Sequence, residues 1–174
     1  MKKFAIALLI TGTLFCCSHR DEPTPEADDF CSGKLELGNQ TFPQTWKLVK
    51  MTGEMINSET TGANMAWQEV IVLNADGTFI KTRKRDTKIT SASGTHAFES
   101  SFGGDPTGIG LTLKYSTENE LIGSCQSKLL QETYTLKSKC QLVGTWSACD
   151  GPGLEYARQI RHVNLIRSWN GFQI

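Results

Sequence analysis

The chain has few of the residues and motifs from which catalytic and metal sites are built. Its 174 residues include only three histidines, His19, His96 and His162, which stand apart from one another. No H-E-x-x-H or C-x-x-C spacing occurs, and no G-x-S-x-G, Walker or dinucleotide-binding motif is present. The sequence therefore predicts no enzyme activity, no metal site and no cofactor.

The chain also lacks an excess of charge of either sign and a long apolar run. Eighteen basic residues balance 18 acidic ones, whereas binding to nucleic acid needs a basic surface. The apolar stretch from Phe4 to Phe15 is interrupted at 11–13 and is shorter than the roughly 20 residues of a membrane-spanning helix. We therefore expect no nucleic-acid partner and no transmembrane helix in this N-terminal stretch.

This short stretch is instead typical of an export signal, because Lys2 and Lys3 precede it and it ends in L-F-C-C. Leu14, three positions before Cys17, makes this end similar to the lipobox of bacterial lipoproteins. The resemblance implies cleavage after residue 16 and attachment of a diacylglycerol, and then palmitate, to Cys17. It also implies a protein held on the membrane through its N-terminal lipid.

Two alternatives to lipidation at Cys17 remain open. Lipidation at Cys16 would place the bulky Phe15 at the cleavage position. An ordinary secretory signal cleaved near Ser18 would leave a soluble protein.

The mature chain of about 160 residues suits one domain behind a tether. Residues 18–29 contain two prolines and five acids, a composition that favours an extended, solvated linker. We predict a signal peptide over 1–16, a lipidated cysteine and flexible acidic tether over 17–40, a barrel over 41–162 and an extension over 163–174. Acidic residues soon after the lipidated cysteine resemble lipoproteins of the Bacteroidetes, which implies the outer membrane, on its surface or periplasmic side.

From residue 41 the chain reads as short strands separated by turns, with no convincing helix of three turns. Asp76-Gly77 between two apolar runs predicts a hairpin. Stretches rich in Ser, Thr and Gly predict loops over 86–94 and 100–110. The predicted strands are 45–51, 69–73, 78–84, 94–100, 108–116, 121–127, 129–136, 141–148 and 154–160. Their spacing predicts an all-β fold, an antiparallel barrel or sandwich.

Four cysteines remain for the folded domain, an even number that suggests two disulfides in an exported chain, with free thiols as the alternative. Cys140 and Cys149 lie at opposite ends of one predicted strand, about 30 Å apart, whereas bridged Cα atoms lie within about 7 Å. A tight turn near 137–139 brings Cys149 level with Cys125 on the outward side. We therefore predict the pairs Cys125–Cys149 and Cys31–Cys140.

Three motifs in order resemble lipocalin-like lipoproteins of the Bacteroidetes: T-W-K-L-V-K over 45–50, N-A-D-G-T-F over 74–79 and C-D-G-P-G-L-E-Y-A-R over 149–158. The resemblance implies an antiparallel up-and-down lipocalin-like barrel of about eight strands. It also implies a structural pair at the closed end, in which Arg158 packs on the ring of Trp46. Gln44 replaces the glycine of the lipocalin G-x-W motif.

Inside such a barrel, alternation along the predicted strand 129–136 places Glu132 on the inner face, opposite Gly144 and with no second acid facing it. A single inward carboxylate predicts a polar anchor for a ligand or marks the wet, open end of the barrel. The predicted ligand-binding residues are Phe79, Leu113, Glu132, Tyr134 and Trp146. The same side chains would fill a closed core if the barrel were packed solid.

The expected function is therefore non-enzymatic binding of a small hydrophobic ligand inside a monomeric, membrane-anchored barrel. The alternative is a cell-surface interaction module, an inhibitor or accessory subunit, acting through loops at 53–66 and 86–110.

Overall fold

The computed structural model describes residues 30–38, 40–53, 55, 57–100, 108–126 and 129–160. Cys17 with the signal peptide, the tether up to residue 29 and the extension over 163–174 lie outside the described residues. The strands are β1 (Gln44–Thr52), β2 (Thr60–Thr61), β3 (Gln68–Leu73), β4 (Thr78–Arg85), β5 (Lys88–Ser100), β6 (Ile109–Tyr115), β7 (Gln131–Ser138), β8 (Gln141–Gly144) and β9 (Gly153–Arg158). Two 3-10 helices, η1 (Gly62–Asn64) and η3 (Trp146–Cys149), lie between strands.

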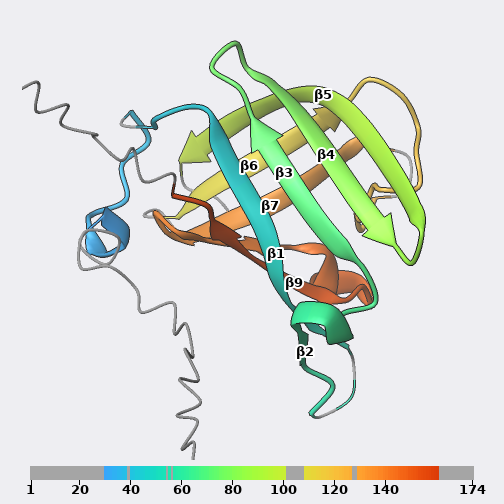
Figure 1. Ribbon diagram of the computed structural model, residues 1–174. Coiled ribbons are helices and arrows are strands. Elements are labelled where there is room, and N and C mark those ends of the chain that lie inside the picture. The colour runs from blue at the N-terminus through green and yellow to red at the C-terminus, as the bar shows by residue number, and fades with distance from the viewer. Residues whose placement is uncertain are drawn as a thin grey trace, which may run out of the picture.

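The strands form one antiparallel sheet that closes on itself (Figure 1). From β3 to β9 each strand pairs with the next in the sequence, and β1 pairs with both β3 and β9. The short β2 is an additional strand, paired with β1 at Lys50 and Met51. The predicted antiparallel up-and-down barrel of about eight strands is therefore confirmed.

Strict alternation along the strands builds the interior. In β4, Phe79, Lys81 and Arg83 point inward and are buried, while Ile80 and Lys84 are exposed. The predicted hairpin before β4 is also present, and the Asp76 carboxylate accepts hydrogen bonds from the backbone N–H and the hydroxyl of Thr78, at 2.9 and 2.7 Å. The local sequence therefore determines both the turn and the face that each side chain of this hairpin occupies.

The predicted loop over 86–94 is wrong, because β5 runs without interruption from Lys88 to Ser100. Its small residues are needed where β5 meets its neighbours: a Cβ on Gly94 would lie 1.9 Å from the backbone oxygen of Lys114 on β6. The close approach of two strands, and not a loop, explains this glycine.

Two other predicted strands differ from the observed structure. Residues 121–126 form an irregular segment whose Leu121 is buried, and β8 stops at Gly144 before the 3-10 helix η3. The β7–β8 turn lies at Lys139-Cys140, so Tyr134 and not Glu132 faces Gly144. This shift of two residues keeps the same side chains inward, because side chains alternate with a period of two.

Each end of the barrel carries one disulfide, and both predicted pairings are confirmed. Cys31–Cys140 joins the N-terminal segment to the β7–β8 turn, with Cα atoms 5.2 Å apart. Cys125–Cys149 joins the 116–130 segment to η3 at the other end, with Cα atoms 5.5 Å apart. Residues 30–38 thus belong to the folded domain and not to the tether predicted over 17–40, since Leu35 also packs against the core.

The end near Cys31 is closed by side chains. Trp46 is fully buried, and its indole N–H donates to Gln44 Oε1 at 3.0 Å. Arg158 pairs with Trp46 across β9 and β1, and its Cζ atom lies 5.9 Å from the Trp46 ring centroid and 5.2 Å from that of Phe30. Gln44 therefore supplies the acceptor that the buried indole needs.

Among the described residues no helix has the length and apolar composition needed to cross a membrane.

Candidate functional site

The middle of the barrel contains four charged side chains from three strands. Lys81 of β4 lies 3.0 Å from Glu69 Oε1 of β3 and 2.9 Å from both carboxylate oxygens of Glu132 on β7. Arg83 donates through Nε to Glu69 Oε2 at 2.5 Å. Lys81 is 0% exposed and Arg83 only 9%, so the charges are removed from water and must neutralise one another. Two cations and two carboxylates leave this ion network with no net charge.

All three tyrosines of the chain donate their hydroxyls to these carboxylates. Tyr156 bonds Glu69 Oε1 at 2.5 Å and Tyr134 bonds Glu132 Oε2 at 3.0 Å. Tyr115 bonds the same Glu132 oxygen. The backbone N–H of Gly123 reaches Glu132 Oε1 at 2.6 Å. Every carboxylate oxygen of the network therefore has partners, as buried charge requires.

The surroundings shift the protonation equilibria strongly. Burial alone would raise the pKa of Glu69, but the charges of Lys81 and Arg83 outweigh it and hold that pKa below its usual value. Burial, together with the neighbouring carboxylates, raises the pKa of Tyr115, Tyr134 and Tyr156. Glu69 is therefore held in its ionised form and the three phenols in their neutral form.

A pocket of about 600 Å³ lies directly above this network, at the open end of the barrel. The starts of β3, β5, β7 and β9 lie at this end, together with the ends of β1, β4, β6 and β8. The pocket is lined by Trp67, Arg83, Arg85, Lys88, Thr90, Glu120, Leu121, Trp146 and Pro152. We call it the mouth pocket. Its volume falls within the range of small-molecule sites in proteins.

The floor of the mouth pocket is sealed by the segment before β7. Leu121 is 1% exposed, and its carbonyl oxygen accepts from Lys81 Nζ at 3.3 Å and from Arg83 Nη2 at 3.4 Å. The inner end of the pocket therefore stops at Leu121 and Arg83, and the ion network lies below them.

Trp146 forms one wall and is held tightly. A Cβ atom on Gly123 or on Gly151 would lie 2.4 Å from the Trp146 ring, so both backbones pack directly on the indole. The disulfide Cys125–Cys149 joins the two segments that carry these glycines. The wall is thus preorganised by covalent and close van der Waals contacts, which reduces the entropy lost on binding.

Another part of the lining is aromatic and cationic. Trp67 lies under two guanidinium groups, with Arg83 Cζ at 4.4 Å and Arg85 Cζ at 5.0 Å from its ring. At the rim, Lys88 Nζ lies 2.6 Å from Glu120 Oε1, which also accepts from Thr90 at 2.9 Å. The mouth pocket therefore offers flat apolar surfaces beside positive charge.

The five predicted ligand-binding residues occupy different layers. Trp146 lines the mouth pocket, while Glu132 and Tyr134 lie below it in the ion network. Phe79 and Leu113 are 0% exposed in the core. No second acid facing Glu132 was predicted from the sequence. The structure has one, Glu69, which is linked to Glu132 through Lys81.

Glu69, Lys81, Arg83 and Trp67 were not predicted as site residues from the sequence. The alternation along the strands could have identified the three charged residues as inward-facing. Lys81 and Arg83 have the same parity as the inward Phe79, and Glu69 has the same parity as Ile71 and Leu73. Charged residues on an apolar face predict a buried network or a site. Among the described residues, no group of three or more His, Cys, Asp or Glu side chains could hold a metal ion.

No family model, curated protein or solved structure matches the chain. The chemistry of the barrel and its mouth pocket is therefore the basis for the function proposed below.

Proposed function

We propose that the protein is a lipocalin-like lipoprotein of the outer membrane that binds a small, largely apolar molecule without transforming it. The observation that carries this proposal is the mouth pocket of about 600 Å³, with a preorganised indole on one wall and a second tryptophan on the other. The ion network below is fully paired and buried, which supports a structural floor and not a catalytic centre.

The proposed ligand lies at the open end of the barrel and not in its centre. Lys81, Tyr134, Phe79 and Leu113 occupy the central volume with 0–2% exposure. An eight-stranded barrel has room for either packed side chains or one small ligand. In this chain the packed side chains fill the centre, so the space for a ligand lies above Leu121.

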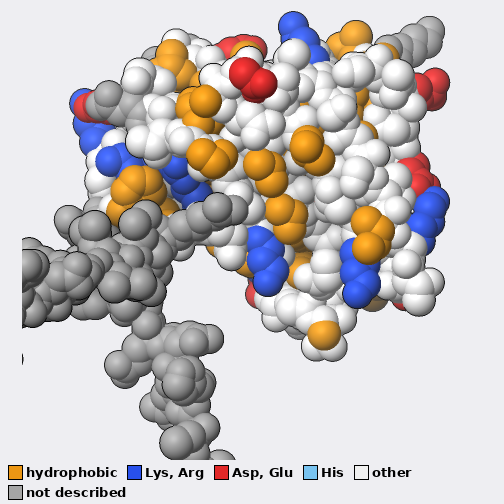
Figure 2. Space-filling model, turned by 45° about the horizontal axis from the view of Figure 1, so that its top comes forward, with side chains coloured by type: hydrophobic (Ala, Val, Ile, Leu, Met, Phe, Trp, Pro, Cys, Tyr) orange, Lys and Arg blue, Asp and Glu red, His pale blue; other side chains and the backbone are white. Residues whose placement is uncertain are grey.

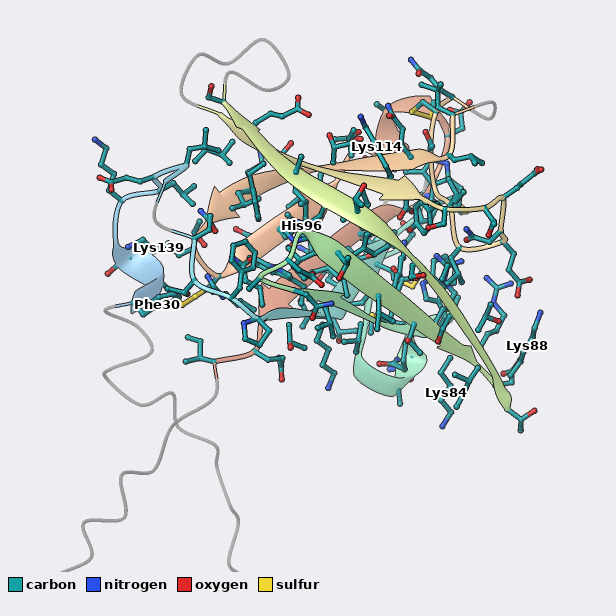
Figure 3. All side chains as sticks on the ribbon, turned by 90° about the horizontal axis from the view of Figure 1, so that it is seen from above. Phe30, Lys84, Lys88, His96, Lys114 and Lys139 are labelled. Carbon is teal, nitrogen blue, oxygen red and sulfur yellow. A yellow bond between two sulfur atoms is a disulfide. The ribbon has the colours of Figure 1, made fainter. Side chains whose placement is uncertain are left out.

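The proposed anchor is Cys17, and the chain that follows it enters the fold at the closed end of the barrel. Phe30 and Cys31 lie at the closed end, where Cys31 is bridged to Cys140. Figure 3 shows Phe30 and Lys139 on one side of the barrel and Lys84 and Lys88, from the β4–β5 hairpin beside the mouth, on the other. The 12 residues between Cys17 and Phe30 span at most about 45 Å. A lipid at Cys17 would therefore keep the closed end within about 45 Å of the membrane surface.

The alternative, a surface interaction module, is not favoured by the face of the molecule that Figure 2 shows. On the face shown in Figure 2, apolar side chains stand apart from one another among polar ones. Protein-binding surfaces have a contiguous apolar centre. We therefore place ligand binding at the mouth pocket first.

A fluorescent dye tests the binding proposal. The mature chain with Cys17→Ser, which carries no acyl chain, should bind the neutral dye N-phenyl-1-naphthylamine with a rise in fluorescence. Trp146→Ala should weaken this binding about tenfold, because an aromatic contact contributes on the order of 1 kcal/mol beyond its apolar area.

Ile80→Ala is the matched control, since Ile80 is 48% exposed on the outer face of β4. Circular dichroism should show that both variants remain folded. Dye binding that is the same for Trp146→Ala and Ile80→Ala would contradict a site in the mouth pocket.

Intact-mass spectrometry tests the anchor separately. The chain purified from membranes of the expressing bacterium should begin at Cys17 and carry the mass of a diacylglycerol with an added acyl chain, and Cys17→Ala should lose this increment. A wild-type chain that begins near Ser18 without lipid would instead establish the ordinary secretory signal.

A further inference from the structure

We infer that the ligand of the mouth pocket is a small monoanion, a carboxylate or sulfonate on a flat apolar body, whose acidic group binds between Arg83 and Arg85. This inference rests on the proposed function and specifies the chemical class of its ligand. Three independent observations lead to it: the charge of the pocket, the free donors of Arg83 and the isolation of Arg85.

The charged side chains that line or underlie the pocket do not cancel. Lys81 and Arg83 neutralise Glu69 and Glu132, and Lys88 neutralises Glu120. Arg85 is the remaining lining cation, so four cations stand against three carboxylates. One unit of positive charge in a partly enclosed apolar site favours a ligand with one negative charge.

Arg83 presents donors that the protein does not use. Its Nε–H is bonded to Glu69, and its two terminal nitrogens make only long contacts, 3.5 Å to the Glu120 carbonyl and 3.4 Å to the Leu121 carbonyl. A guanidinium carries five N–H groups, so two have no acceptor among the described residues. The bond to Glu69 and the Trp67 ring at 4.4 Å hold the group in place, which suits bidentate binding of a planar acid.

Arg85 is the exposed cation beside it. Its Cζ lies 5.0 Å from the Trp67 ring centroid, and no carboxylate of the described residues lies within ion-pair distance. Two residues apart on β4, Arg83 and Arg85 share one side of the strand and both line the pocket. An acidic group placed here would meet both guanidinium groups beside the same indole.

The remaining walls select the rest of the ligand. Trp146 and Pro152 supply further apolar surface, and Trp146 is held rigidly between glycine backbones. Flat aromatic walls favour a planar or polycyclic body over a flexible chain. The expected ligand is therefore amphipathic, with its charge and its apolar body at opposite ends.

Two dyes with the same aromatic skeleton test this inference. N-phenyl-1-naphthylamine is neutral, and 8-anilinonaphthalene-1-sulfonate differs from it by one sulfonate. The mature chain with Cys17→Ser should bind the sulfonate at least about tenfold more tightly, because hydrogen bonds to charged groups exceed this energy. Arg85→Gln should remove most of this preference, because the affinity for the sulfonate should fall much more than the affinity for the neutral dye. Lys84→Gln is the matched control, one residue earlier on β4 and exposed on the outer face.

The outcomes separate the two proposals. Equal affinities for both dyes in the wild type, or an Arg85→Gln variant indistinguishable from Lys84→Gln, would overturn the monoanion inference and leave small-molecule binding standing. Failure of both dyes to bind would overturn the binding function together with the inference. A wild-type sulfonate preference that Arg85→Gln abolishes and Lys84→Gln retains supports both proposals.

Discussion

Lys81→Met is expected to lower the free energy of unfolding by about 3–5 kcal/mol, because removing one partner of a buried ion pair leaves its partner charge uncompensated. Lys81 is the only group that joins Glu69 to Glu132 within the described network, at 3.0 and 2.9 Å. Without it two carboxylates would face a single arginine in a volume that water does not reach. Methionine preserves the shape of the stem, so the loss would reflect charge and not a cavity.

Urea unfolding followed by circular dichroism measures this effect, with Lys84→Met as the control. Lys84 lies on the same strand but is exposed, and its replacement should change stability by less than about 0.5 kcal/mol. A decrease in the free energy of unfolding below about 1 kcal/mol for Lys81→Met would show that Lys81 does not neutralise the buried carboxylates as proposed.

A second variant separates charge from packing. Adding Glu132→Gln to Lys81→Met removes one carboxylate and leaves Glu69 paired with Arg83, so the double variant should recover about 1 kcal/mol or more. Losses that simply add would show that the two side chains are not coupled.

Alkaline unfolding is the second large expected effect. The folded state raises the pKa of Tyr115, Tyr134 and Tyr156 through burial and through the charges of Glu132 and Glu69. In the unfolded chain tyrosine ionises near pH 10. A raised folded-state pKa contributes stability that is fully present below that pH and is lost as the pH rises above it. With three such groups the free energy of unfolding should fall by about 4 kcal/mol per pH unit above about pH 10, since each contributes about 1.4 kcal/mol per unit.

The test is unusually clean because the chain has no other tyrosine. Tyrosinate absorbance in the near ultraviolet should stay flat as the pH rises and then appear in one step that coincides with the loss of strand circular dichroism. Tyr134→Phe should lower the steepness of the pH dependence by about one third. Gradual ionisation near pH 10 in a protein that is still folded would contradict a sealed network.

Burial of this network explains why the pocket of the barrel lies at its mouth and not at its centre. Three phenols, two carboxylates, a lysine and an arginine occupy the volume that an open barrel would leave for a ligand. Their mutual hydrogen bonds satisfy the charges, and the Leu121 carbonyl caps the cations from above. The chemistry that remains accessible is the unpaired face of Arg83 with Arg85, Trp67 and Trp146.

Much of the fold followed from local patterns. The alternation of apolar residues and the Asp76-Gly77 turn predicted the β3–β4 hairpin, and the strand order followed from short connections. The predicted strands over 121–127 and 141–148 led to the correct disulfides, although the described residues of these segments form a strand only over Gln141–Gly144. The register error of two residues between β7 and β8 left the inward faces unchanged, because parity survives any even shift.

The long strand β5 was the clearest failure of local patterns. Lys88, Ala92 and Gly94 have weak strand propensities, and pairing with β4 along the segment and with β6 from Gly94 onward makes it a strand. The segment over 121–126 is the opposite case, because a strand was predicted there and the structure has an irregular segment. Its apolar Leu121 and Ile122 are typical of a strand, yet Leu121 turns inward to seal the barrel.

The sequence by itself thus determined the all-β class, the hairpin, the cysteine pairing and, by resemblance, the expected export and lipid anchor. Only the tertiary structure decided what the barrel contains. Parity states that Glu69, Lys81 and Glu132 point inward, but not that they meet, because Lys81 and Glu132 are 51 residues apart and come into contact only when the sheet closes. The charge balance of the interior, the position of the mouth pocket and the uncompensated charge of Arg85 all depend on that closure.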